Sequence, residues 1–293
     1  MTPGDAARET GTVLDRIVAD RRARLVEDKR TNDEAALRAR IDALGPQVSL
    51  AARLREGRRA MPDGARLRLV AEIKRASPSK GLFDADLDAG KQARAYADAG
   101  AAAISVLTEP DHFRGTVADL EAARQAVEGD VDRPALLRKE FIFDPYQVIE
   151  ARAFGADALL LITMLLGRDA LADLIALTRS LDMEPLVEVH DEDEVRTALD
   201  AGARVLGVNN RDLRTFVEDL GVTERLAALV PPEVTLVAES AIRNAEDARR
   251  MAEAGAHALL VGEALVLSGD VPAKARELML APASVEAPDG TRA

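Results

Sequence analysis

Residues Asp98 to Thr108 have the sequence D-A-G-A-A-A-I-S-V-L-T, in which a short Gly-containing motif is followed by an apolar run. Related motifs recur as F-G-A at 154–156, D-A-G-A at 200–203 and E-A-G-A at 253–256, each after a stretch rich in alanine and charge. A helix that ends at a left-handed glycine and then turns tightly explains the motif. The uninterrupted apolar runs that follow are typical of strands buried on both faces of a parallel sheet.

The spacing of this repeat predicts the number of strands. Its glycines, Gly100, Gly155, Gly202 and Gly255, are separated by 55, 47 and 53 residues. Because one strand–helix–strand unit needs only ~30 residues, each interval has room for a second strand and helix. Further runs beginning near residues 67, 135, 184 and 234 fill those places. Eight strands, each followed by a helix, predict an α/β fold with a single (β/α)8 TIM barrel. A doubly wound open sheet is the alternative, and it leaves the even spacing unexplained.

Three regions are expected along the chain. Residues 1–60 are predicted to form a helical extension that covers the catalytic mouth, with helices around 13–25, 35–44 and 50–55. Residues 61–275 are predicted to form the barrel. Residues 276–293 are rich in proline, serine, glycine and acidic residues, and we expect a disordered tail there.

Composition excludes several classes of protein. The formal net charge is −12 and aromatic residues make up 3% of the chain, so a nucleic-acid-binding surface is not expected. The absence of cysteine rules out disulfides, a cysteine nucleophile and thiolate metal ligands. Three dispersed histidines, His112, His190 and His257, do not predict a metal site. Because no apolar stretch reaches ~18 residues, we expect no membrane span and a cytoplasmic location.

Charged and polar residues stand at the ends of the predicted strands, where barrel enzymes carry their active sites. These residues are Glu72, Lys74, Lys139, Glu188, Asn209 and Glu239. Burying such charges is costly unless they are paired, so two lysines and three glutamates at one mouth predict a functional cluster rather than solvent-exposed side chains. Only six basic residues in the chain are lysines, and two of them are in this set. Lysine can donate a proton where arginine cannot.

A phosphate site is expected beside this cluster. The loops after the seventh and eighth predicted strands begin with Ser240-Ala241 and Gly262-Glu263, whose small residues let backbone N–H groups approach an anion. Ser77 and Arg211 are candidate additional donors. Ordinary tight turns are the alternative interpretation of these loops.

Over roughly residues 12–270, the chain resembles the indole-3-glycerol phosphate synthase family. The similarity is a series of motifs in order rather than one match. The motifs are V-L-D-R-I (13–17), A-E-I-K-R-A-S-P-S (71–79), S-V-L-T-E (105–109), F-R-G (113–115), L-R-K-E-F-I (137–142), P-Y-Q (145–147), P-L-V-E-V-H (185–190), G-V-N-N-R-D-L (207–213), V-A-E-S (237–240) and V-G-E-A-L (261–265).

The resemblance implies a cofactor-independent carboxy-lyase of tryptophan biosynthesis. Its substrate would be 1-(2-carboxyphenylamino)-1-deoxyribulose 5-phosphate, which undergoes ring closure, decarboxylation and dehydration. By similarity, Lys139 is the general acid, and Glu188 and Lys74 take part in proton transfer. The remaining roles carried over are orientation and hydroxyl binding (Glu72, Asn209, Glu239), contact with the aromatic ring (Phe113, Phe141) and phosphate binding (Ser77, Arg211, Ser240, Ala241, Gly262, Glu263). The expected partner is this phosphorylated small molecule, and the expected state is a monomer or weak homo-oligomer without a metal.

Two positions depart from the family pattern. Ala241 stands where the family usually has glycine, and it would cost roughly 1 kcal/mol if that position needs a positive φ. Glu140 replaces the usual aspartate beside Lys139, from which we expect little effect.

The sequence leaves two other functions open. A non-catalytic barrel paralogue has Ala241 as its only support and predicts lost catalytic residues, which are present. Phosphoribosylanthranilate isomerase is another phosphate-binding barrel, but that family works with a cysteine, which this chain lacks. We expect no fused second barrel after residue 270.

Overall fold

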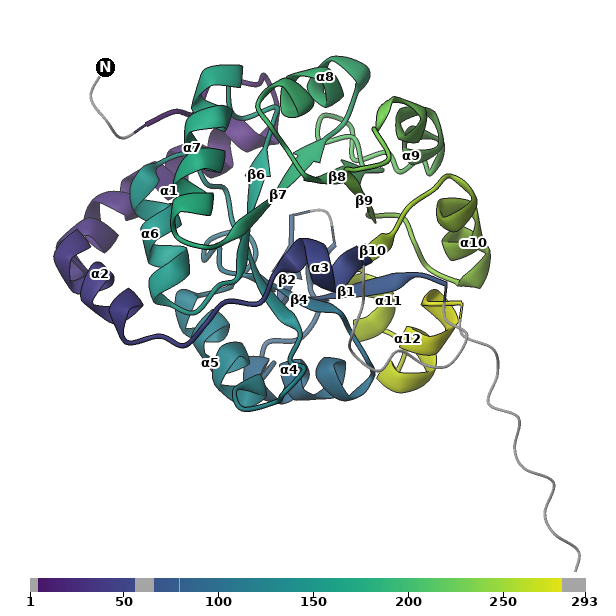
Figure 1. The fold of residues 1–293 in the computed structure, drawn as a ribbon, viewed down its shortest axis with the longest axis horizontal. Coiled ribbons are helices and arrows are strands. Elements are labelled where there is room, and N and C mark those ends of the chain that lie inside the picture. The colour runs from purple at the N-terminus through teal and green to yellow at the C-terminus, as the bar shows by residue number, and fades with distance from the viewer. Residues whose placement is uncertain (1–4, 56–65, 79, 281–293) are drawn as a thin grey trace, which may run out of the picture.

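The computed structural model describes residues 5–55, 66–78 and 80–280. Within them, eight parallel strands close into a barrel, in which β1 pairs with β4 on one side and with β10 on the other (Figure 1). The barrel strands are β1 (Arg68–Ile73), β4 (Ala103–Leu107), β5 (Ala135–Lys139), β6 (Ala158–Ile162), β7 (Glu184–Val189), β8 (Val205–Asn209), β9 (Thr235–Glu239) and β10 (Ala258–Val261). The predicted (β/α)8 barrel is confirmed, and the open sheet is excluded.

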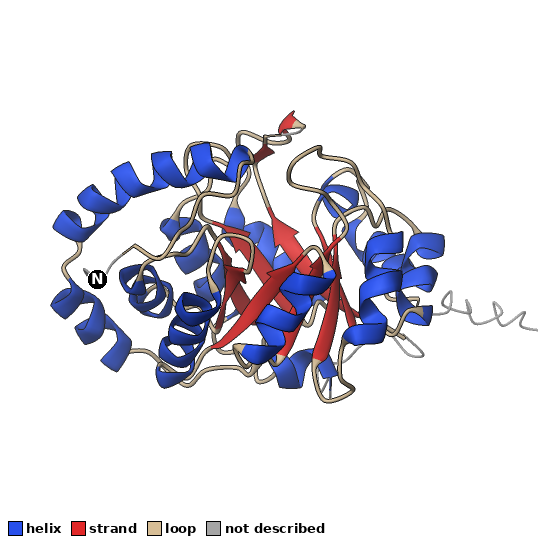
Figure 2. Ribbon diagram, turned by 90° about the horizontal axis from the view of Figure 1, so that it is seen from above, coloured by secondary structure: helices blue, strands red, loops and turns tan. Residues whose placement is uncertain are grey.

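Helices surround the strands, as Figure 2 shows from the side of the barrel. They are α4 (Ala89–Asp98), α5 (Val117–Val127), α6 (Pro145–Ala153), α7 (Arg168–Ser180), α8 (Glu192–Asp200), α9 (Gly221–Leu226) with the 3-10 turn η1 (Ala227–Leu229), α10 (Ala245–Glu253), α11 (Glu263–Val266) and α12 (Val271–Leu278). A small hairpin, β2 (Ala76–Ser77) with β3 (Gly81–Leu82), follows β1. No described helix is long and apolar enough to cross a membrane.

The repeat that predicted the strands has the expected backbone geometry. Gly100, Gly155, Gly202 and Gly255 have φ values of 87°, 90°, 91° and 96°. Each follows a helix and leads within three residues to a barrel strand. A side chain is strained at such φ values, so glycine is the residue that lets every second helix turn directly into the sheet.

Side-chain caps fix where helices begin after the βα loops. Asp88 caps α4, and capping boxes begin α5 (Thr116 with Asp119) and α6 (Asp144 with Gln147). Each cap satisfies backbone N–H groups that have no partner within the helix. These helices therefore start at defined residues beyond the catalytic ends of the strands.

The N-terminal extension divides between the two ends of the barrel. Its helices are α1 (Val13–Thr31), α2 (Glu34–Asp42) and α3 (Leu50–Arg55). The start of α1 lines the cavity at the catalytic mouth, as predicted, and lies at the same end as the β2–β3 hairpin (Figure 2). However, α2 packs on α6, and α3 covers the opposite end, where Arg55 donates to the carbonyl of Glu233 just before β9. Among the described helices of the extension, α1 alone therefore reaches the mouth.

The C-terminal boundary differs slightly from the predicted one. α12 runs to Leu278, three residues past the predicted end of the barrel at residue 275, and Leu278 is buried. The rest of the predicted tail, residues 281–293, lies outside the described residues.

Candidate active site

A cavity of about 420 Å³ opens at the carboxyl ends of the barrel strands. Its wall includes residues from or directly after β1, β5, β7, β8, β9 and β10, together with the first turns of α1. Parallel strands in a closed barrel all end at the same face, so residues that are distant in sequence meet there. All of the predicted site residues except Glu239 line this cavity: Glu72, Lys74, Ser77, Phe113, Lys139, Phe141, Glu188, Asn209, Arg211, Ser240, Ala241, Gly262 and Glu263.

Lys139, the last residue of β5, lies between two carboxylates. Its Nζ is 2.6 Å from Oε2 of Glu239 and 3.5 Å from Oε2 of Glu188. Glu239 lies beneath Lys139 rather than in the cavity wall, which favours its orienting role over its expected contact with substrate hydroxyls. Lys139 and Glu188 are thus left facing the cavity.

Lys74 and Glu72 form a second pair on the next side of the mouth. Glu72 lies on β1 and Lys74 directly follows this strand, and both face the cavity because side chains alternate along extended backbone. Nζ of Lys74 is 2.6 Å from Oε1 of Glu72. We call Glu72, Lys74, Lys139, Glu188 and Glu239 the inner charge cluster.

Two glycines provide the space that the inner charge cluster occupies. A Cβ on Gly207 would lie 2.0 Å from Oε1 of Glu239, and one on Gly262 would lie 2.7 Å from Oε1 of Glu72. Gly262 was predicted as a phosphate contact, and this geometry gives it the additional role of admitting Glu72. Gly207 was missed, although its place inside an apolar strand run was a signal of close approach.

The electrostatics of the inner charge cluster hold Lys139 as a cation. Burial opposes its charge, but Glu239, Glu188 and Glu72 raise the pKa of Lys139 above its ordinary value. Burial likewise opposes ionisation of Glu188, yet Lys139, His190 and Asn209 lower the pKa of Glu188 to about 2. For Glu239, burial and the charges of Glu188 and Glu72 outweigh Lys139 and raise its pKa to about 7. The cluster therefore offers a protonated amine beside a firmly ionised carboxylate.

An apolar, aromatic wall adjoins this cluster. The rings of Phe113 and Phe141 lie 6.1 Å apart between centroids, and Leu14 and Ile17 of α1 face the same cavity. The loop carrying Phe113 turns at Gly115, where a Cβ would lie 2.0 Å from the Leu107 carbonyl oxygen. This wall suits a flat aromatic group.

The opposite side of the cavity has backbone donors and cations. The short helix α11 begins at Glu263 with no side-chain cap, so its first N–H groups are available to an anion. Ser77, Ser240 and Ala241 line the same region. Arg211 also reaches it, with its Nη2 2.5 Å from Oε1 of Glu218.

Sequence reasoning missed three charged residues at this end. They are Glu218, Arg243 and Lys80. Glu218 pairs with Arg243 as well as with Arg211. Nζ of Lys80 lies 3.4 Å from Oε1 of Glu263. Burial opposes the charge of Glu218, but Arg211, Arg243 and Lys80 lower the pKa of this carboxyl. The stabilisation of one half-buried carboxylate by three cations indicates an environment suited to anions. Their positions in loops with no apolar periodicity gave no sequence signal.

Ala241 has a φ of 63°, and its neighbour Ser240 has a φ of 65°. Because φ is positive, the backbone at Ala241 is strained relative to the glycine that the family usually has at this position. Ala241 still lines the cavity with its backbone in the conformation that glycine adopts readily.

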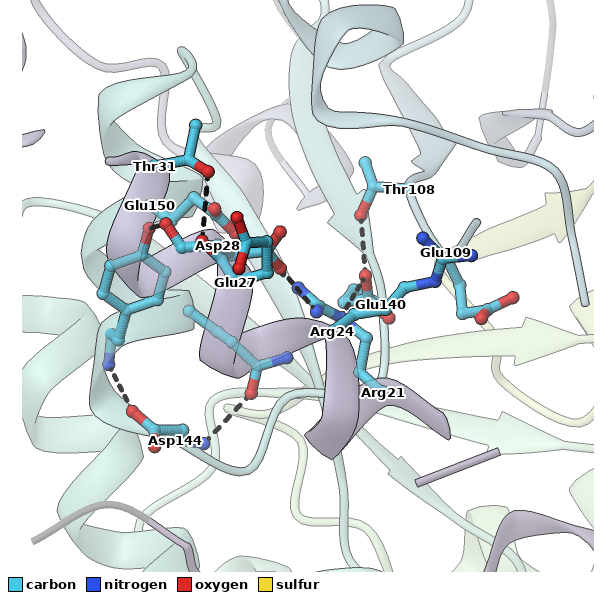
Figure 3. A network of polar contacts seen from close by, with 12 residues as sticks. Arg21, Arg24, Glu27, Asp28, Thr31, Thr108, Glu109, Glu140, Asp144 and Glu150 are labelled. Carbon is cyan, nitrogen blue, oxygen red and sulfur yellow. Dashed lines mark hydrogen bonds and ion pairs between the residues drawn. The ribbon is translucent and has the colours of Figure 1, made fainter. Parts of the chain in front are cut away.

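Glu140, the other departure from the family pattern, borders the cavity, but its carboxylate takes part in a buried polar network with a residue of α1 (Figure 3). Its Oε2 accepts from Nε of Arg21 on α1 at 3.2 Å. Arg138 donates to Glu150 at 2.6 Å and to Thr108 at 3.1 Å. We call Arg21, Arg138, Glu140 and Glu150 the outer charge network. It joins α1 and α6 to the strand that carries Lys139.

No grouping of His, Asp and Glu among the residues in the described ranges could hold a metal ion. His190 is a further residue that sequence reasoning left without a role. Its Nε2 lies 3.4 Å from Oε1 of Glu188.

The fold and the inner charge cluster together define a (β/α)8-barrel enzyme. Its lysine and glutamate side chains are placed for acid–base chemistry at a cavity that also has cations at its edge. A sequence profile described as indole-3-glycerol phosphate synthase matches residues 14–278. The chain belongs to the indole-3-glycerol phosphate synthase family.

Individual relatives agree with this assignment. Indole-3-glycerol phosphate synthase of Roseiflexus sp. (strain RS-1) is 48% identical, with 91% of this chain and 98% of that protein covered. The protein of the same name from Dehalococcoides mccartyi (strain CBDB1) is 46% identical, with 91% and 100% covered. Among solved structures, 3-hexulose-6-phosphate synthase from Salmonella typhimurium superposes with a TM-score of 0.58 at 14% identity, covering 73% of this chain and 98% of that one. That likeness concerns the fold alone.

Proposed function

We propose that this chain forms indole-3-glycerol phosphate from 1-(2-carboxyphenylamino)-1-deoxyribulose 5-phosphate, with Lys139 as the general acid. The observation that carries this proposal is the position of Lys139. Its protonated amine faces the cavity between Glu188 and Glu239, where a substrate carbonyl can receive a proton. Family membership supports the reaction, and the geometry supports the assignment of roles.

The reaction needs two protons delivered and one removed. A carbon–carbon bond forms between the ring carbon that bears the carboxylate and C2, and the C2 carbonyl oxygen takes a proton from Lys139. Carbon dioxide then leaves, and its bonding electrons restore the aromatic ring. The C2 hydroxyl takes a second proton and leaves as water while C1 loses a proton. Each general acid or base contributes ~10²–10⁴ in rate.

The other residues of the inner charge cluster divide the remaining work. Glu188 serves the later proton transfers because its carboxylate is ionised and faces the cavity. Lys74 acts as the second acid or pairs with the substrate carboxylate, and Glu72 orients it. Glu239 orients Lys139 from below. Asn209 lines the cavity beside Glu188 and is placed to bind a substrate hydroxyl.

Substrate binding uses the two walls of the cavity. Phe113 and Phe141 flank the aromatic ring of the substrate. The phosphate lies at the opposite end, held by the backbone of Ala241, Gly262 and Glu263 and by the side chains of Ser77, Ser240 and Arg211. Local cations compensate for the net charge of −12, which would otherwise repel this anion.

A fluorescence assay for the indole product, run on the wild type and Lys139→Ala, tests this function. We expect turnover in the wild type and its loss in the variant. Equal turnover in both proteins would remove Lys139 from its role while leaving the reaction. No turnover by folded wild type would refute the proposed function and favour a non-catalytic barrel.

The proposal includes a phosphorylated small molecule as partner, a cytoplasmic location and a monomer or weak homo-oligomer. Sedimentation velocity across a concentration series tests the last point.

A further inference from the structure

His190 follows the last residue of β7 and lies between the active site and helix α8. Its side chain is only 8% exposed. Nδ1 lies 3.0 Å from Oε2 of Glu194 on α8, and the backbone N–H of His190 donates to the same oxygen at 2.8 Å. The ring is therefore anchored on its outer side by Glu194.

The inner side of the ring faces Glu188. Nε2 is buried, makes no hydrogen bond within the described structure, and lies 3.4 Å from Oε1 of Glu188. The other oxygen of Glu188, Oε2, is the one that faces Lys139 at 3.5 Å. Each oxygen of this carboxylate thus has a cation-capable partner on a different element, β5 on one side and the residue after β7 on the other.

We propose that His190 is a positioning residue whose imidazolium holds Glu188 ionised and keeps its Oε2 turned toward Lys139 and the cavity. This inference rests on the proposed role of Glu188 in proton transfer. Lys139 and Asn209 also stabilise the charge of Glu188, and a second cation on the opposite oxygen adds to this stabilisation and restricts rotation of the carboxylate.

The groups around His190 favour its charged form. Glu188 and Glu194 face the two ring nitrogens. Beyond the ring, a shallow surface pocket is lined by His190 together with Asp191, Glu192, Asp193, Arg225 and Leu226. Burial opposes protonation, but the carboxylates of Glu188 and Glu194 raise the pKa of His190 to about 10. The imidazolium is thus retained throughout the neutral range.

The first experiment measures kcat and kcat/KM against pH for the wild type and His190→Gln. Glutamine keeps an amide donor but has no charge, so the pKa of Glu188 rises. The acid limb of kcat should move to higher pH by ~1–3 units, the usual effect of one nearby charge, while KM at the pH optimum changes less. Asp193→Asn is the matched control, because Asp193 is in the first turn of α8, next to Glu194, and its side chain is 92% exposed. Its acid limb should coincide with that of the wild type.

The second variant, Glu194→Gln, removes the outer carboxylate and leaves His190 in place. The pKa of His190 should fall, so the acid limb shifts in the same direction as in His190→Gln but less far. An unshifted acid limb in both variants would overturn the inference, and so would equal shifts in Asp193→Asn.

A direct measurement covers the case in which the variants do not fold. The chain has three histidines, so imidazole NMR of the wild type can follow each ring after assignment. We expect the His190 ring to stay protonated from pH 6 to 9, and a transition near its ordinary pKa, about 6.5, would overturn the inference. This readout does not depend on turnover. Full activity of Glu188→Gln would instead refute the role of Glu188 in the proposed function.

Discussion

Arg138 and Lys139 are neighbours on β5 and both carry a positive charge into buried surroundings, but they face opposite sides of the barrel wall. Arg138 belongs to the outer charge network, where Glu150, Thr108 and the Gln147 carbonyl accept its hydrogen bonds. No buried side-chain nitrogen or oxygen of the outer charge network lacks a partner in the described structure. All four residues of the network are buried.

Lys139 belongs to the inner charge cluster, which is not saturated. Oε1 of Glu239 is buried without a hydrogen-bond partner, and the cluster opens on the cavity. The pKa of Glu239 is raised to about 7, whereas that of Glu188 is lowered to about 2. Buried charges whose partners are complete stabilise an arrangement, whereas charges with incomplete partners and perturbed pKa values are available for proton transfer. The alternation of side chains along one strand separates the two uses.

Removal of the charge on the cavity side, in Lys139→Met, should have the largest effect on catalysis. We expect kcat to fall ~10²–10⁴-fold, because the acid is lost. The free energy of unfolding should fall by less than in the Arg138→Met variant, because Glu239 takes a proton at neutral pH and His190 remains beside Glu188. Steady-state kinetics together with urea unfolding check both statements. A stable protein with near wild-type kcat would contradict the role assigned to the inner charge cluster.

Arg138→Met is the matched change on the outer side. The change removes the cation that pairs with Glu150 at 2.6 Å and leaves Arg21 to balance both Glu150 and Glu140. Breaking a buried ion pair in this way costs about 3–5 kcal/mol of stability. We expect urea unfolding to show that loss in the free energy of unfolding, while kcat per folded molecule stays within a few-fold of wild type. A loss of kcat as large as that of Lys139→Met, in fully folded protein, would show that the two sides are not separable.

Within the inner charge cluster, Glu188 and Glu239 should make the stability of the protein depend on pH in different ranges. The pKa of Glu188 is lowered in the folded state to about 2, so its contribution is present above its unfolded pKa and is lost as the pH falls toward 2. The pKa of Glu239 is raised to about 7, so its contribution is present below its unfolded pKa, near 4.5, and is lost as the pH rises through 7. These two carboxylates on one lysine therefore act in opposite directions.

Thermal unfolding at a series of pH values tests these signs. Relative to wild type, Glu188→Gln should lose less stability between pH 4.5 and 2, and Glu239→Gln should lose less between pH 4.5 and 7. Curves parallel to the wild type in both windows would contradict the assigned directions.

The smallest effect concerns the backbone at the edge of the cavity. Ala241→Gly relieves a positive φ of 63°, and we expect a gain of about 1 kcal/mol in the free energy of unfolding. Ala252→Gly, inside α10, is the control and should lose about 1 kcal/mol, because glycine is unfavourable within a helix. If both variants were destabilised equally, Ala241 would not be strained.

Much of the site could be predicted from sequence because the barrel converts a one-dimensional pattern into a ring. Once the glycine repeat and the apolar runs indicated eight parallel strands, every polar residue at the end of a run had to lie at one mouth. That reasoning placed Lys74, Lys139 and Glu188 together although more than 100 residues separate the first from the last. Family resemblance then supplied their chemistry.

Other features had no local signal. The division of the N-terminal extension between the two ends of the barrel depends on where α2 and α3 find complementary surface. The role of Glu140 depends on Arg21, 119 residues earlier in the chain, and that of His190 depends on a helix that follows it.

Local patterns in the sequence were enough to predict the number and order of strands, the residues at their catalytic ends and the family, because buried strands and helix-ending glycines are local properties of the chain. The folded structure was needed to learn which carboxylate meets which cation, that Glu239 pairs with Lys139, and that Ala241 has a positive φ. Ion pairing depends on distances of a few ångströms that closure of the barrel and side-chain packing fix. Residue spacing along the chain does not specify those distances.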